Sequence, residues 1–187
     1  MKRLVKFDDA LASVFSGRDR HLLRDFNFMN GGRPPSVRKL AEDLGFEIEE
    51  RSLPRSVSGF LEPAMTADKG FRIVVNKWQS VVRRRWTVLH EIAHYYLHPQ
   101  HTELFAREAH RADVAGIGHF YLEDELEEER EADHWVEAIV FDQKALETSV
   151  ARYGSDLEAI AKVFGVSTRT ARIAIAKRIP KQGGAAL

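Results

Sequence analysis

The sequence contains no cysteine, and this absence removes several kinds of chemistry. A chain without cysteine forms no disulfide, offers no thiolate to a metal and has no cysteine nucleophile. Any metal site must therefore be built from histidine and carboxylate side chains. The chain has the residues for such a site, because it contains 8 histidines and 28 acidic residues.

The sequence also lacks a long hydrophobic run and an excess of charge of either sign. No apolar stretch approaches the roughly 18 residues that are needed to cross a bilayer. The segment Met1–Asp9 starts with basic residues but has acids where a signal peptide has its apolar run. Because 28 basic residues balance 28 acidic ones, no global field attracts nucleic acid or an anionic membrane. We therefore expect a cytoplasmic protein without a membrane partner.

The apolar pattern predicts an α+β fold with a small antiparallel sheet. A weak helical pattern over residues 1–30 leads into a loop rich in glycine and proline, after which Ser36 caps a short helix. Alternating or β-branched runs predict strands around 46–49, 59–61 and 71–75. Turn residues at 67–70 predict that the last two strands form an antiparallel hairpin.

Two long helices are expected after the strands. The first covers 81–97, and its apolar stripe consists of Val82, Trp86, Leu89, Ala93 and Leu97. The second covers about 122–142. We expect three parts along the chain: a helical extension and linker at 1–35, a central α+β domain at 36–150, and a helical segment at 151–187.

The C-terminal segment resembles a helix-turn-helix. The pattern from Ser155 to Glu158 is that of a capping box, and the turn falls at 165–167. The second helix carries basic residues, including Arg169 and Arg172, that could enter a major groove. Without stronger basic clustering, we expect this segment to pack on the rest of the chain rather than to contact DNA.

The first long helix contains His90-Glu91-Ile92-Ala93-His94, a metal-binding pattern. Residues four apart lie on one helix face, about 6 Å apart along the axis, so His90 and His94 can converge on one ion. Glu91 is rotated by roughly 100° and can reach a water beside that ion. This geometry predicts two metal ligands and a general base.

The second long helix supplies two acids at core positions. Glu129 and Asp133 continue a stripe that is otherwise apolar, so burial would require a metal or a bonded partner. Glu129 as the third metal ligand and Asp133 as the acceptor for a free histidine N–H would satisfy both. Two histidines, one glutamate and an open fourth position form a catalytic zinc arrangement.

Two segments together resemble the ImmA/IrrE metallopeptidase family. The run Arg83–His98 is similar to the family core R-x-R-F-T-x-x-H-E-x-x-H-x-x-x-H, and Glu129–Trp135 is similar to its E-x-E-A-N-x-F segment. The spacing of Glu129 and Asp133 also resembles the E-x-x-x-D arrangement of gluzincins. The resemblance implies a minimal zincin-like domain with one zinc ion per chain, held by His90, His94 and Glu129. It further implies cleavage of an intracellular repressor or antitoxin-like regulator.

Several alternatives stay open at the level of sequence. Two imidazoles and a carboxylate would also accept manganese or iron. The chain could instead be a DNA-binding regulator whose metal is structural, or a pseudo-enzyme that binds a repressor without cutting it. His98 lies four residues after His94, but a fourth protein ligand would close the site, so we expect a helix-end role. No residue is assigned to oxyanion stabilisation, for which Tyr95, Tyr96, His119 and Tyr121 are candidates.

Overall fold

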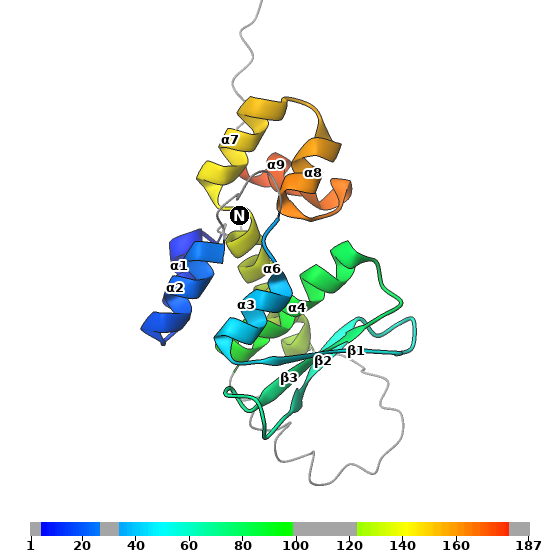
Figure 1. Cartoon of the computed structure of the whole chain (residues 1–187). Helices are drawn as coiled ribbons and strands as arrows, with labels where there is room; N and C mark the ends of the chain where they lie inside the picture. Colours follow the sequence, from blue (N-terminus) through cyan, green and yellow to red (C-terminus); the bar gives the residue numbers. More distant parts are fainter. Residues whose placement is uncertain (1–4, 27–33, 99–122, 180–187) are drawn as a thin grey trace, which may run out of the picture.

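The computed structural model describes residues 5–26, 34–98 and 123–179, and in these ranges the chain forms eight helices and three strands (Figure 1). The elements before the first long helix are α1 (Phe7–Ala12), α2 (Gly17–Phe26), α3 (Val37–Leu44), β1 (Glu47–Arg51), β2 (Gly59–Pro63) and β3 (Phe71–Asn76). The remaining helices are α4 (Val81–Leu97), α6 (Glu123–Val140), α7 (Gln143–Tyr153), α8 (Leu157–Phe164) and α9 (Thr168–Arg178). The predicted α+β class is confirmed.

The sheet is mixed, so the prediction of an antiparallel sheet was wrong. Its order is β1-β3-β2: β3 pairs antiparallel with β2, as the hairpin prediction required, but parallel with β1. The physical reason is burial. Ile73, Val74 and Val75 are almost fully buried, so β3 takes the centre and is inserted between the two strands that precede it. Both outer strands carry glutamates that stay near the surface.

Local signals set the boundaries of the helices that lead to the site. The Ser36 hydroxyl accepts a hydrogen bond from the backbone N–H of Lys39 at 3.2 Å, and Gly45 ends α3 with φ of 98°. Ser80 caps α4 in the same way, accepting from the N–H of Arg83 at 3.2 Å. A hydroxyl at this position satisfies a backbone donor that has no partner within the helix. The boundaries predicted for α4 agree with the structure.

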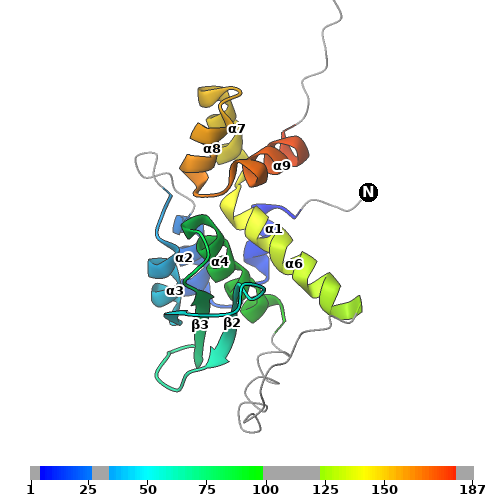
Figure 2. The same ribbon diagram turned by 90° about the vertical axis from the view of Figure 1, so that its right-hand side faces the viewer.

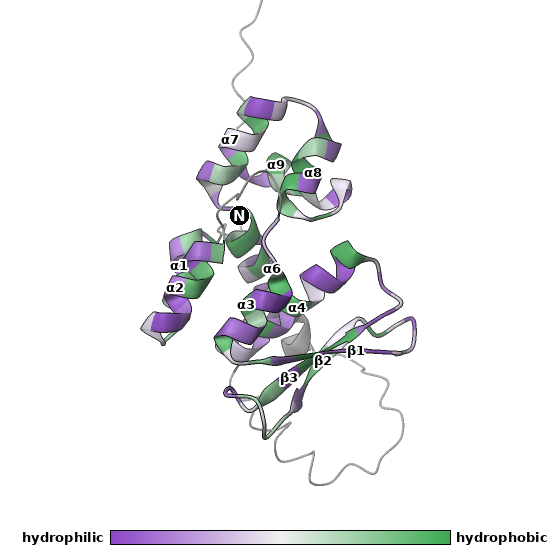
Figure 3. Cartoon of the chain, in the orientation of Figure 1, coloured by the Kyte–Doolittle hydropathy of each residue, from purple (hydrophilic) through white to green (hydrophobic). Residues whose placement is uncertain are grey.

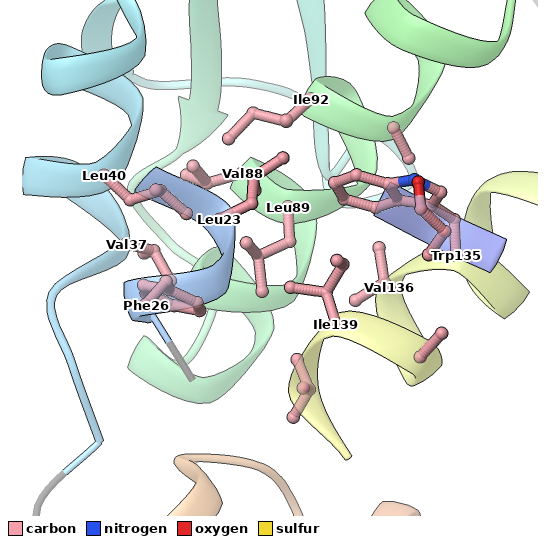
Figure 4. Close-up of a cluster of buried hydrophobic side chains, with 14 of the residues drawn as sticks. Leu23, Phe26, Val37, Leu40, Val88, Leu89, Ile92, Trp135, Val136 and Ile139 are labelled. Carbon is pink, nitrogen blue, oxygen red and sulfur yellow. The ribbon is translucent and has the colours of Figure 1, made fainter. Parts of the chain in front are cut away.

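The core lies where α4 packs against α6, with the sheet on one side of α4 (Figures 1 and 2). Val88, Leu89 and Ile92 of α4 meet Val136 and Ile139 of α6, and all five are buried (Figure 4). Along the helices around this core, patches of hydrophobic and hydrophilic residues alternate (Figure 3), as expected of helices with one buried and one exposed face. This packing fixes how the two long helices face each other.

The C-terminal helices differ from the sequence prediction in two details. Helix α7 was not expected, and it begins because the Asp142 carboxylate accepts from the backbone N–H of Lys144. Helix α8 is capped by Asp156, which accepts from the N–H of Ala159 at 3.0 Å, rather than by Ser155. Either residue can act as a cap, and the backbone path decided between them. None of the described helices is long and apolar enough to cross a membrane.

Candidate metal centre

Helix α4 brings two imidazole nitrogens together. His90 and His94 are one turn apart, and their Nε2 atoms lie 3.0 Å from each other. Both side chains are largely shielded from solvent, with 14% and 18% of their surface exposed. Because the helix holds both rings on one face, no rearrangement of the backbone is needed for them to converge.

Helix α6 places a carboxylate against the same two nitrogens. Glu129 Oε2 lies 3.0 Å from His90 Nε2, and Glu129 Oε1 lies 3.1 Å from His94 Nε2. Within the described part of the chain, His90, His94 and Glu129 form the group with the donor set and spacing to hold a metal ion. The structure therefore brings together the three residues expected as ligands from two helices, although His90 and Glu129 are 39 residues apart in sequence.

The chemistry of these three groups fits a divalent metal. His90 Nδ1 lies 3.1 Å from Oδ1 of Asp133, a carboxylate that can only accept, so Nδ1 carries a proton. His90 Nε2 faces a carboxylate oxygen and a second imidazole nitrogen, so a positive charge at this place, carried by a proton or by a metal cation, would be stabilised. Ligands of a tetrahedral zinc ion lie about 3.3 Å apart, given bonds of about 2.0–2.1 Å. The observed separations of 3.0 and 3.1 Å are close to that value.

The pKa shifts of His90, Glu129 and Asp133 also indicate that this site favours a positive charge. Burial alone lowers the pKa of His90, but hydrogen bonds to Asp133 and Glu129 outweigh burial and raise this pKa to about 10. Burial raises the pKa of Glu129, but hydrogen bonds to His90 and His94 hold it well below its usual range. The pKa of Asp133 is lowered too: its hydrogen bonds to His90 and Trp86 outweigh its burial.

Trp86 is a site residue that the sequence does not reveal. From the sequence it is only a member of the apolar stripe, but its Nε1 donates a hydrogen bond to Asp133 Oδ1 at 3.0 Å. The same oxygen faces His90 Nδ1, so Trp86 and His90 hold one carboxylate between them. The available signal is spacing: Trp86 precedes His90 by one helical turn, and Asp133 follows Glu129 by one turn.

The acids are less buried than the stripe on α6 predicts. The Glu129 and Asp133 side chains are 40% and 55% exposed, so neither is a core residue. The reason is their place on the helix: the buried face of α6 contains Ala132, Val136 and Ile139, and the two acids lie beside that face, next to His90. Both acids have the histidine partner that the sequence predicted. They are not buried, however, as that prediction assumed.

Glu91 lies beside the three-residue group and is not part of it. Its side chain is half-buried between α4 and β2, near the backbone of Leu61. Burial raises the pKa of Glu91, and the charges of His90 and His94 and the N–H of Leu61 act in the opposite direction. Such a carboxyl group is suited to accept a proton and return it.

The other candidates have different places. His98 ends α4, where its backbone N–H bonds the carbonyl of His94, and it does not join the group of potential ligands in the described residues. Tyr95 packs edge-on against Phe46, with ring centroids 5.0 Å apart. Tyr96 bonds a buried carboxylate on α2, away from the histidines. Residues 99–122, with His119 and Tyr121, lie outside the described ranges.

Comparison with known proteins gives one result that bears on this site. No curated protein matches the chain. The profile of the Peptidase_M78 family, described as the IrrE N-terminal-like domain, matches residues 41–176. This range is most of the chain and contains α4, α6 and every residue of the candidate centre. The chain therefore belongs to the ImmA/IrrE family of metallopeptidases.

Proposed function

We propose that the protein is a zinc-dependent endopeptidase that hydrolyses a peptide bond in another protein. The observation that carries the proposal is the convergence of His90 Nε2, His94 Nε2 and the Glu129 carboxylate within 3.1 Å of one another. The order of these residues on two packed helices, with Glu91 directly after the first ligand, suits catalysis better than a closed structural site. One zinc ion per chain is expected.

The residues of the chain divide the chemical work. When bound, zinc supplies Lewis acidity, which polarises a carbonyl group and lowers the pKa of water. His90, His94 and Glu129 would hold the ion, and Asp133 fixes the His90 ring through Nδ1. Glu91 takes one proton from the attacking water and passes it to the leaving amine, so that a carboxylic acid and an amine are the products.

The substrate class follows from family analogy. We propose an intracellular transcriptional repressor or antitoxin-like regulator, cleaved under stress or in the control of a mobile element. A cytoplasmic location agrees with this substrate class. The identity of the partner that the protein captures tests this proposal.

The decisive experiment uses Glu91→Gln as a substrate trap. This change removes the proposed base but none of the three metal ligands, so the variant should bind one zinc per chain, hold its partner and leave it intact. Wild-type protein should then cut the captured partner at a defined bond. Cleavage by Glu91→Gln at the wild-type rate would exclude Glu91 as the base.

The third ligand has a matched control on the same helix. Glu129→Ala should weaken zinc binding by at least about 100-fold, because one of three protein ligands is lost. Glu127→Ala removes an exposed glutamate that pairs with Arg130, and it should leave zinc binding unchanged. Equal zinc affinity in the two variants would remove Glu129 from the site.

One rival function has a structural feature in its favour. Arg169 and Arg172 are exposed on α9. A DNA-binding regulator with a structural metal would tolerate Glu91→Gln and lose its function on Arg169→Ala and Arg172→Ala. The peptidase proposal predicts the reverse, and a partner captured by wild type but never cut would favour a pseudo-enzyme.

A further inference from the structure

The two N-terminal helices, α1 and α2, each form a hydrogen bond with one of the two helices that carry the candidate metal centre. Both lie before residue 41, where the family match begins, so they are an element that the family assignment does not explain. In Figure 2, α1 lies alongside α6. Helix α2 packs against α3 and reaches α4 through the hydrogen bond between Asp19 and Tyr96. The contacts described below join each long helix to one of the short ones.

The first contact joins α2 to α4 through a buried carboxylate. Asp19 is only 3% exposed, and its Oδ2 accepts a hydrogen bond from the Tyr96 hydroxyl at 2.7 Å. Lys69 Nζ lies 2.5 Å from the same oxygen, so the buried charge is paired. Tyr96 follows the ligand His94 by two residues.

The second contact joins α1 to α6 through an indole. Trp135 is 2% exposed, and its Nε1 donates to the carbonyl of Ala10 at 3.0 Å and to the Ser13 hydroxyl at 3.1 Å. The Ala10 carbonyl, in the last turn of α1, also accepts from the Ser13 hydroxyl at 2.7 Å, so the indole joins a small hydrogen-bonded group at the end of this helix. Trp135 lies between α6 and the N-terminal helices (Figure 4). It follows Asp133 by two residues.

The two contacts meet in one ring pair between α4 and α6. The Tyr96 and Trp135 rings are stacked, with centroids 6.5 Å apart and planes 25° apart. Each ring therefore touches the other across the helix interface, and its polar tip is held by a different N-terminal helix. A residue two positions further along a helix is rotated by about 200°, so both rings point away from the side that carries the metal ligands.

We propose that α1 and α2 form a clasp that sets the spacing of α4 and α6 and thereby the geometry of the metal centre, with Tyr96 and Trp135 as positioning residues. The inference rests on the proposed metal site. His90 and His94 come from one helix and Glu129 from the other, so a shift between the helices changes the ligand distances directly. Groups that orient metal ligands commonly change metal affinity by about 10- to 100-fold.

The test compares conservative variants with matched controls. Tyr96→Phe and Trp135→Phe remove the hydroxyl and the indole N–H while keeping an aromatic ring. Tyr153→Phe on α7 and Trp78→Phe at an exposed position are the controls. Each clasp variant should bind zinc about tenfold more weakly, and its cobalt(II) complex should have altered visible absorption bands. Both controls should match the wild type.

A second measurement separates positioning from loss of stability and uses the unaltered chain. Coupling is reciprocal, so zinc should slow amide hydrogen exchange in residues 17–26 of the wild type but not of Glu129→Ala. Ile160→Val destabilises the buried face of α8 without touching the clasp, and it should keep the wild-type cobalt spectrum. Unchanged zinc affinity and cobalt spectra in both clasp variants would overturn the clasp alone. A wild type that binds no zinc would overturn the metal site and the clasp together.

Discussion

Trp86 and His90, one turn apart on α4, contact the same oxygen of Asp133 on α6, at 3.0 and 3.1 Å. This shared oxygen orients the His90 ring so that Nε2 faces Glu129 and His94. It also ties the two long helices together next to the ligands. The arrangement makes Trp86 part of the site through a hydrogen bond, although its ring belongs to the packing stripe.

Replacing Trp86 by phenylalanine should weaken zinc binding by about tenfold. The ring remains, but Asp133 loses a donor and becomes free to turn away from His90 Nδ1. A competition titration with a zinc chelator measures the effect. Trp78→Phe removes an indole that is 71% exposed, and it should leave the affinity unchanged. Equal affinities for Trp86→Phe and the wild type would exclude the hydrogen bond as a support of the site.

Zinc should stabilise the folded chain strongly. An ion present at about 1,000 times its Kd adds about 4 kcal/mol to the free energy of unfolding, provided the unfolded chain binds it weakly. For a chain of 187 residues this raises the Tm by about 8–16 °C. Thermal unfolding with zinc, and again after addition of a chelator, measures the shift.

The same thermal unfolding experiment distinguishes the metal ligands from the general base. Glu91→Gln should retain the full shift in Tm, because it removes none of the three ligands. His90→Ala should lose it. A shift that persists in His90→Ala would place the bound zinc elsewhere on the chain.

Replacing Asn76, the last residue of β3, should destabilise the fold. It is fully buried, and its Nδ2 donates to the carbonyls of Leu53, Pro54 and Val57 at 2.8 to 3.2 Å. Asn76→Ala leaves these carbonyls without that donor and should lower the free energy of unfolding by about 2–3 kcal/mol. Urea denaturation of the zinc-loaded protein measures the loss. Zinc affinity should not change, and a parallel loss of affinity would contradict this separation.

The outer face of the sheet should lose stability in acid. The hydrogen bond from Arg51 lowers the pKa of Glu49 below its ordinary value of 4.5. A folded-state pKa that is lowered stabilises the fold above the unfolded-state pKa, and this contribution is lost as the pH falls through the folded value. Glu49→Gln should therefore lose less stability than the wild type between about pH 6 and about pH 3.

Urea denaturation at a series of pH values measures this difference. The matched control is Glu158→Gln, which changes an exposed glutamate on α8. Its stability should follow the pH curve of the wild type. Parallel curves for Glu49→Gln and the wild type would show that the ion pairs of the sheet do not contribute.

The parts of the fold that could be predicted are those with local causes. Ser36, Gly45 and Ser167 act within three or four residues, and each begins or ends a helix. The cap at Ser36 was expected. The hairpin of β2 and β3 follows from a short turn. The pairing of β1 with β3 could not be predicted, because alternation identifies a strand but says nothing about its neighbours.

The sequence by itself determined which side chains can bind a metal and which two share a helix face, because residues four apart on a helix are neighbours whatever surrounds it. It also determined that the ligands are two imidazoles and a carboxylate, since no thiol is present. Only the tertiary structure decided that Trp86 holds Asp133 across 47 residues and that Trp135 reaches Ala10 across 125. These contacts depend on how whole helices pack, and packing is the sum of many weak interactions over the core rather than the property of any short segment.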